Sequence, residues 1–228
     1  MTKRLLALLM IGSILLSGAP VQAMPSPLQQ RIATWPNWTL PGPLTRPGLG
    51  DDLIYPDWFS GLWQVQSLDP DDPDASLMHQ ARFNRDHRNL LVADRAFNTL
   101  SLGAIVLGDQ LLRVEVDPHT ANRQMAQLKG DQRLETSVVG RRQETPDGDS
   151  FLADELVLQI LHAPGPPRLS RIETLSRYRH CEDDPSEICA EQWQARFQAP
   201  GEALRDQAVA SHRYKLRFTP LRESAPST

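Results

Sequence analysis

The sequence predicts an all-β fold: a single antiparallel barrel or highly curved sheet of about eight to ten strands, with one short helix and a proline-rich N-terminal arm. Most of the chain after residue 55 alternates apolar and polar side chains in short runs that end at turn-forming residues. These runs do not alternate with helical segments as the strands of a parallel sheet do, which favours an antiparallel meander. Closure of the sheet into a barrel removes exposed strand edges.

The first expected strand, residues 61–68, shows the pattern clearly. Trp63, Val65 and Ser67 share one face of it, because successive side chains of a strand point in opposite directions. The other expected strands are residues 78–84, 90–93, 111–116, 123–128, 133–144, 151–162, 168–180, 188–198 and 210–220. Residues 95–107 place apolar side chains at helical spacing instead and predict the short helix.

Four regions follow from this reading: a signal peptide (1–23), a proline-rich arm or linker (24–54), the barrel domain (55–220) and a flexible tail (221–228). Lys3 and Arg4 precede an apolar run that is shorter than the roughly 18–20 residues needed to span a bilayer. Residues 21–23 resemble a signal-peptidase site. We therefore expect an exported protein, with an uncleaved signal anchor as the alternative.

The arm is expected to contain no helix, because its prolines interrupt helical hydrogen bonding. They are Pro25, Pro27, Pro36, Pro41, Pro43 and Pro47. Trp35 and Trp38 are costly to leave in water, so the arm is expected to lie at least partly against the domain. The alternative is that these two tryptophans make peripheral contact with a membrane or with a partner protein.

The charge balance and the cysteines bear on the binding partners and on the redox compartment of the protein. The chain has 24 basic and 28 acidic residues, and this mildly acidic balance argues against non-specific nucleic-acid binding, which needs a basic surface. Cys181 and Cys189 are the two cysteines of the chain and flank one acidic loop. In an oxidising compartment we expect them to form a local disulfide, with two free thiols as the alternative.

The opening Gly61-Leu-Trp63 of the first strand resembles the signature of calycin-type β-barrels, such as lipocalins and nitrobindins. The resemblance implies that Gly61 and Trp63 close one end of the barrel, with an arginine from the last strand, Arg217 or Arg213, stacked on Trp63. In nitrobindin-like barrels a late histidine ligates haem, which makes His212 a candidate axial ligand. A half-buried core histidine is the alternative.

Residues 50–220 also resemble a family of uncharacterised exported proteins of cyanobacteria, with relatives in the chloroplast thylakoid lumen. The residues that carry this resemblance are 55–63, 95–98, 122–123, Tyr178 and 190–192. The family has no established activity. The resemblance therefore implies a compartment, the thylakoid lumen or the periplasm, more than a chemistry.

The candidate ligand-binding residues are aromatic or charged side chains on the later strands together with the first-strand tryptophan: Trp63, Arg177, Tyr178, Trp193, His212 and Tyr214. Charged residues also recur within the later strands: Glu155, Arg171, Glu173, Arg177, Glu191 and Arg196. We expect these to face outward as cross-strand pairs. The alternative is that some line a polar cavity.

No nucleophile elbow, phosphate loop or dinucleotide fingerprint occurs in the sequence, so it does not indicate catalysis. The six histidines form no closely spaced pair, and no metal site is predicted. The favoured function is a non-enzymatic binding protein for a small apolar or amphipathic ligand: a pigment, a lipid or haem. An assembly or stability factor that docks on a membrane protein complex is the alternative, and a lipocalin-like isomerase or hydrolase is a distant third.

Overall fold

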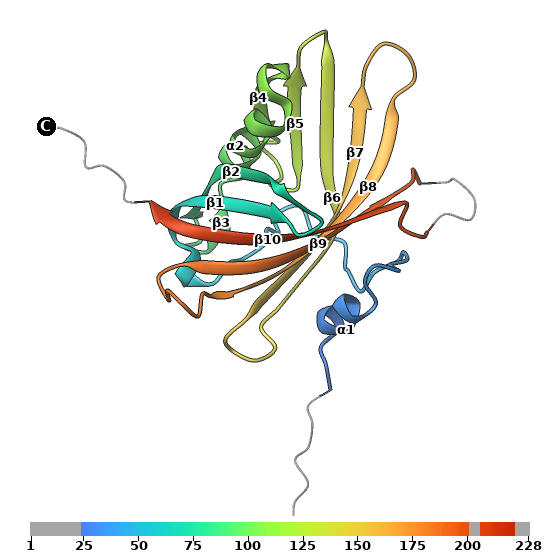
Figure 1. Cartoon of the computed structure of the whole chain (residues 1–228). Helices are drawn as coiled ribbons and strands as arrows, with labels where there is room; N and C mark the ends of the chain where they lie inside the picture. The colour runs from blue at the N-terminus through green and yellow to red at the C-terminus, as the bar shows by residue number, and fades with distance from the viewer. Residues whose placement is uncertain (1–23, 201–205, 222–228) are drawn as a thin grey trace, which may run out of the picture.

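The computed structural model describes residues 24–200 and 206–221, and in it the chain forms one ten-stranded antiparallel sheet that curls into a half-barrel (Figure 1). The strand order is β3-β2-β1-β10-β9-β8-β7-β6-β5-β4. This order is the antiparallel meander expected, with the first and last strands of the domain joined in the middle. The curved-sheet form of the prediction is confirmed, since β3 and β4 stand at opposite ends of the sheet.

The elements agree closely with the expected segments. Their bounds are α1 Pro27–Ala33, η1 Asp57–Phe59, β1 Gly61–Asp69, β2 Asp72–Arg85, β3 Leu91–Ala93, α2 Arg95–Leu107, η2 Gly108–Gln110, β4 Leu111–Val116, β5 Arg123–Leu128, β6 Gln132–Glu144, β7 Phe151–His162, β8 Arg168–His180, β9 Ile188–Phe197 and β10 Ala210–Leu221. The expected signal peptide lies outside the described residues, as does the expected tail apart from Leu221.

Strand register divides the side chains between an inner, concave face and an outer, convex face. Trp63, Val65 and Phe218 share the inner face through β1 and β10. Trp193 and Leu175 pair across β9 and β8 on the outer face. Each face carries its own hydrophobic cluster, so the sheet is buried from both sides at different places along its strands.

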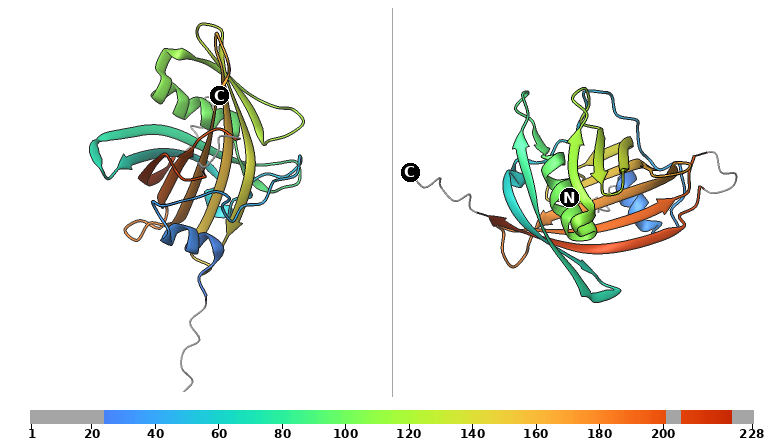
Figure 2. Two further views of the ribbon diagram at one scale, coloured as in Figure 1. Left: turned by 90° about the vertical axis from the view of Figure 1, so that its right-hand side faces the viewer. Right: turned by 90° about the horizontal axis from the view of Figure 1, so that it is seen from above.

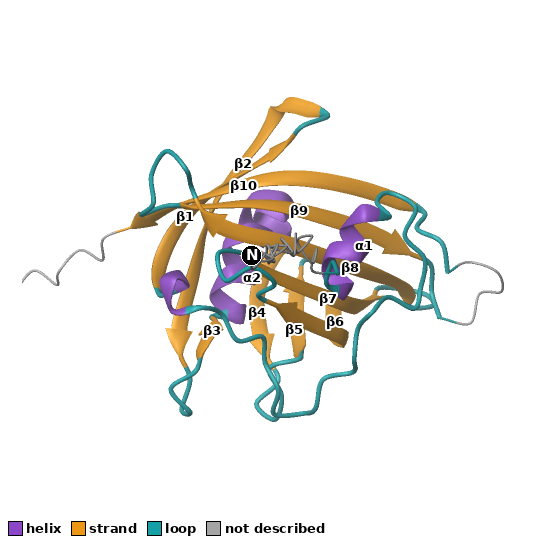
Figure 3. Cartoon of the chain, turned by 90° about the horizontal axis from the view of Figure 1, so that it is seen from below, coloured by secondary structure: helices purple, strands orange, loops and turns teal. Residues whose placement is uncertain are grey.

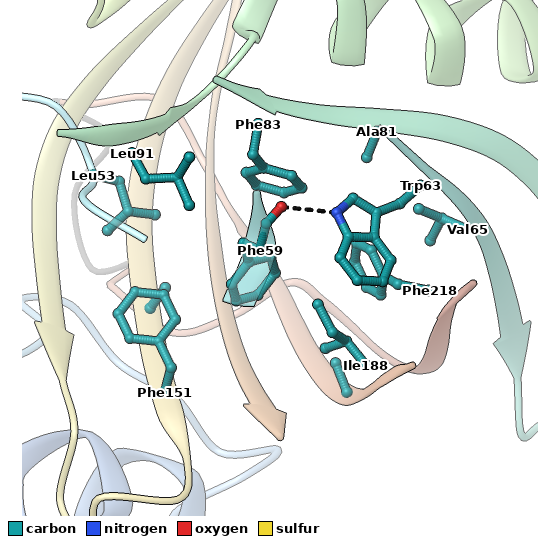
Figure 4. Close-up of a cluster of buried hydrophobic side chains, with 12 residues drawn as sticks. Leu53, Phe59, Trp63, Val65, Ala81, Phe83, Leu91, Phe151, Ile188 and Phe218 are labelled. Carbon is teal, nitrogen blue, oxygen red and sulfur yellow. Dashed lines mark hydrogen bonds between the residues drawn. The ribbon is translucent and has the colours of Figure 1, made fainter. Parts of the chain in front are cut away.

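The inner cluster surrounds Phe59, which η1 inserts into the curl of the sheet (Figure 4). Gly61, with φ at +112°, turns the chain sharply into β1, a conformation that side chains other than glycine rarely adopt. Trp63 then donates its indole N–H to the carbonyl of Phe59 at 2.7 Å. Phe83 and Phe151 contact Phe59 from the side. This end of the half-barrel is filled by aromatic rings.

The arm covers the outer face, and it does contain a helix, contrary to expectation. Proline is tolerated at the first position of a helix because its missing N–H has no partner there, and α1 begins at Pro27. Ser26 and Gln29 form a capping box around that start. Trp38 is 1% exposed within the outer cluster and Trp35 packs against that cluster, so the arm lies against the domain as expected. Membrane contact through these two residues stays a prediction. Figure 3 shows α1 over β7 and β8.

An ion pair holds the arm to the sheet. Arg31 of α1 donates two hydrogen bonds to Glu173 of β8, at 2.8 and 2.7 Å, and both side chains are buried. Asp154 of β7 is fully buried beside them, and its carboxyl oxygens have no hydrogen-bond partner among the described residues. Burial and then the nearby Glu173 raise the pKa of Asp154 well above its usual value.

Helix α2 spans the two ends of the sheet (Figure 2). The Asn98 side chain accepts a hydrogen bond from the backbone N–H of Arg82 at 2.7 Å and donates one to the carbonyl of the same residue at 3.2 Å. These bonds replace a missing strand partner along the edge of β2. At the other end, a Cβ on Gly103 would lie 2.5 Å from the side chain of Leu111, so glycine permits the close approach of α2 to β4.

The cysteine prediction is also confirmed. Cys181 and Cys189 form a disulfide that joins the end of β8 to β9. The loop that it closes carries Asp183 and Glu187, which bind Arg217 of β10. The crosslink therefore holds a turn whose acidic residues reach across the sheet.

Replacing Arg31 by methionine should lower the free energy of unfolding by about 3–5 kcal/mol, because Glu173 is left charged and buried without its partner. Urea denaturation monitored by tryptophan fluorescence measures this. The double variant R31M/E173M removes both charges and should recover much of the loss. Equal losses in the single and double variants would show that the buried charge is not the cause.

Asp154→Asn should make the protein more stable at pH 8, because the amide is neutral without binding a proton. The raised pKa means that the folded state favours protonated Asp154. The stabilising effect of this proton is complete below the pKa of the unfolded chain, and it is lost as pH rises towards the folded-state value. The gain over wild type should therefore shrink towards pH 4. The exposed Asp149→Asn is the control, and a gain for Asp154→Asn that is independent of pH would contradict the account.

Candidate functional site

The structure separates the predicted ligand-binding residues into three groups. Trp63 and Tyr178 belong to the inner aromatic cluster. His212 and Tyr214 stack with their ring centroids 6.2 Å apart, further along the inner face of β10. Arg177 and Trp193 lie on the outer face. The three groups do not form one site.

Trp63 is buried in the inner aromatic cluster, and the expected arginine lid is not over it. Trp63 is opposite Pro220 in the register, whereas Arg217 is opposite Gln66 and lies on the outer face. The Arg217 guanidinium binds Glu187 and Asp183 instead. The ring centroids of Tyr178 and Phe59 are 5.0 Å apart. Burial raises the pKa of the Tyr178 hydroxyl above its usual value.

The charged strand residues divide between the two faces. Arg171, Glu173, Arg177 and Glu191 point outward, as expected, although the arm then buries Glu173. Glu155 and Arg196 point inward. The outward expectation therefore holds for most of them and is wrong for these two.

Glu155 is the centre of an ion cluster on the inner side. It accepts hydrogen bonds from Arg95 of α2 at 3.0 Å and from Arg141 of β6 at 2.8 Å. Arg95 also binds Asp52 of the arm, and Arg141 binds Asn122. Burial alone raises the pKa of Glu155, but the two arginines outweigh it and hold the pKa below its usual value. The cluster connects the arm, α2 and the sheet.

Beyond the aromatic cluster, the inner face carries a surface that we call the inner wall. It has two rows of aliphatic side chains that run across the strands, with one polar row between them. The aliphatic rows are Val114, Ala126, Leu134 and Leu161, then Val138, Val157 and Ile172, and the polar row is Gln124, Thr136 and Gln159. Apart from Ala126, all of these residues are only partly buried.

Helix α2 extends the inner wall. Arg95 and Thr99 reach the inner-face residues Glu155 and Gln124, so this stripe of the helix faces inward. Leu102 and Val106 follow on the same stripe at helical spacing, and they are 40% and 60% exposed. No residue of α2, all of which are described, is buried. The helix thus leaves apolar side chains uncovered beside the half-barrel.

Two features of the site were readable from the sequence but were not predicted. Asp154 interrupts the apolar parity of Leu152 and Leu156, and a lone carboxylate in an apolar stripe indicates a buried acid. Residues 151–162 are apolar on both parities, which indicates a strand with something on each face. No local sequence pattern predicts the ion cluster around Glu155, because its other members, Asp52, Arg95 and Arg141, come from separate segments of the chain.

The described residues contain one group with metal-ligand geometry, Cys181, Asp183 and Cys189. Both sulfurs are in the disulfide and are not available as thiolates. None of the described helices has the length and hydropathy needed to cross a bilayer.

Comparison with known proteins identifies a family. A family model for a domain of unknown function, DUF6816, matches residues 71–222, from the first hairpin to the end of β10. No curated protein and no solved structure matches the chain. The expected membership of an uncharacterised family is supported, whereas its cyanobacterial or lumenal source stays a prediction. Because the match covers well over half of the chain, the protein belongs to the DUF6816 family.

Proposed function

We propose that the protein is a non-enzymatic binding protein that holds a small amphipathic molecule on its inner wall. The observation that carries the proposal is the pair of aliphatic rows on the concave face. Val138, Val157 and Ile172 line up across three strands and remain partly exposed. A soluble domain usually buries such a row, and an apolar surface that stays uncovered favours a binding role.

The remaining exposed area of these side chains favours binding of an apolar group. Covering an aliphatic side chain that is already partly buried contributes about 1 kcal/mol. A ligand that covers several members of the two rows therefore gains several kcal/mol, part of which offsets the entropy lost on association. A flexible alkyl chain fits rows that run across successive strands.

The polar row indicates what the other end of the ligand carries. Gln124 accepts a hydrogen bond from Thr99 of α2 at 3.0 Å, but its amide nitrogen is buried without a partner among the described residues. A buried donor without an acceptor is unfavourable. A ligand carbonyl or carboxylate at the seam between α2 and β5 supplies that acceptor.

Among the ligands expected from the sequence, a fatty acid or lipid fits this surface best. Haem requires His212, which is exposed on β10 rather than enclosed by the aliphatic rows. A carotenoid-like pigment would use the rows but would leave the Gln124 amide without an acceptor. The proposal thus favours an alkyl chain with an acidic or carbonyl head.

The proposed setting is an exported, oxidising compartment, the periplasm or thylakoid lumen. The Cys181–Cys189 disulfide supports it, since such bonds persist where thiols are not kept reduced. The basic and apolar pattern of residues 1–23 supports export.

A docking role on a larger assembly is the second candidate. Leu100, Ile105 and Leu107 of α2 are exposed in addition to the two residues beside the inner wall. If the helix binds a partner protein, the native complex purifies with that protein and without a lipid. Native mass spectrometry of the protein from its own host separates the two roles.

Val157→Gln should weaken binding of a fluorescent fatty acid, cis-parinaric acid, by about tenfold, because a polar group replaces the centre of an aliphatic row. Fluorescence titration at constant ionic strength measures the affinity. Leu169→Gln is the matched control: it introduces the same side chain on neighbouring β8, on the outer face. Equal effects of both substitutions, or no binding by wild type, would refute the inner wall as the site.

A further inference from the structure

The outer face has a groove of its own, away from the inner wall. Its volume is about 500 Å³, and it crosses β1, β10, β9 and β8. It is lined by Gln66, Leu68, Arg177, Arg179, Cys189, Ala190, Glu191, Lys215, Leu216 and Arg217. Four of these residues are cationic and one is acidic, in a chain whose formal net charge is −4.

The register explains why the cations surround a hollow. Arg179 and Arg217 flank Cys189 in one row across three strands, and Arg177 and Lys215 flank Glu191 in the next row on the same face. The four cations therefore mark a rectangle of roughly 10 by 7 Å, from the strand spacing and the two-residue repeat. Cys189 is small, and its sulfur is held by the disulfide to Cys181, so the side of the rectangle between Arg179 and Arg217 stays low, while Glu191 lies between Arg177 and Lys215 on the other side.

The cations around the groove differ in the ion pairs that they form. Arg177 and Arg213 both bind Glu191, which leaves one positive charge in excess. Arg217 is held by Glu187 and Asp183.

Lys215 has no ion pair among the described residues. The Arg179 contact with Glu182 is 3.5 Å long between two well-exposed side chains, and such pairs contribute little. Lys215 and Arg179 therefore stand at opposite corners of the rectangle and are available to a ligand.

The groove has room for more than a simple ion. Leu68 of β1 lies on the outer face at one side of the groove, and the volume of the groove exceeds that of a single phosphate or sulfate. Multiple charge-assisted hydrogen bonds from Arg and Lys are the usual means of holding a phosphate group. An organic group attached to that phosphate fits against Leu68.

We propose that this groove binds the phosphate group of a phosphate ester, between Arg179, Lys215 and the flanking Arg177 and Arg217. The phosphate lies between Arg179 and Lys215, where it replaces the weak contact of Arg179 with Glu182 and gives Lys215 a partner. The same chemistry is present in a soluble phosphate ester and in the headgroup of an anionic phospholipid. This site is separate from the inner wall and does not depend on the function proposed for it.

The test uses the full mature chain and three probes at low ionic strength: inorganic phosphate, glycerol 3-phosphate, and vesicles of phosphatidylcholine with added phosphatidylglycerol. Calorimetric titration measures the first two and vesicle co-sedimentation the third. The variant R179Q/K215Q keeps the arginines that hold Glu191 and Glu187. It should lower affinity for the bound probe by at least about tenfold. Wild-type binding should also weaken as salt is added.

The matched control is R113Q/K129Q, which removes two exposed cations from β4 and the turn after β5 and so changes the net charge equally. Its affinity should equal that of wild type. Binding of glycerol 3-phosphate identifies a soluble ester, and binding of the vesicles alone identifies a lipid headgroup. Equal losses in both double variants would show non-specific charge attraction and would overturn the proposal. So would the absence of binding to all three probes.

Discussion

The ion cluster of Arg95, Arg141, Glu155 and Asp52 is the interaction on which the half-barrel depends. A sheet of ten strands with two free ends tends to flatten or to close, and neither happens here. The cluster ties α2 and the arm to the middle of β6 and β7 on the concave side. Because its members are largely buried, loss of one charge leaves the others uncompensated, and the cluster forms as a unit.

The two faces of the sheet are consequently used in different ways. The arm buries the outer face beneath α1 through Arg31 and Glu173, and aromatic rings fill one end of the inner face around Phe59. Helix α2 protects the edge of β2 and contacts the inner wall at Gln124. The curvature is thus fixed by polar contacts, while an aliphatic surface on the concave side stays open. This division is compatible with the proposed binding role, since ligand sites are usually largely formed before the ligand binds.

Local patterns in the sequence predict most of this fold. Alternation and turn residues place nearly all strand ends within one residue of the observed ends, apart from the start of β2, which differs by six residues, and helical spacing gives α2 its bounds. Pro27 misled the prediction for α1, since proline breaks a helix interior but starts a helix well. The prediction that Arg217 covers Trp63 was wrong, because Arg217 and Trp63 point to different faces of the sheet.

The candidate site was less predictable. The aliphatic rows appear only when register aligns β6, β7 and β8, and the partners of Glu155 come from three distant segments. Local sequence patterns therefore predict neither the alignment of the aliphatic rows nor the contacts of Glu155. The unpaired amide of Gln124 likewise becomes visible only beside Thr99, since its environment is made by the helix that crosses in front of it.

The central claim is that the inner wall is an open surface that binds an alkyl chain. Methyl NMR of protein labelled at Val, Leu and Ile tests it most directly, with a saturated fatty acid as the titrant. We predict that the methyl signals of Val138, Val157 and Ile172 shift together and saturate at one equivalent, while those of Leu62 and Leu169 on the outer face stay in place. Shifts confined to the outer face, or an inner wall that does not respond, would contradict it.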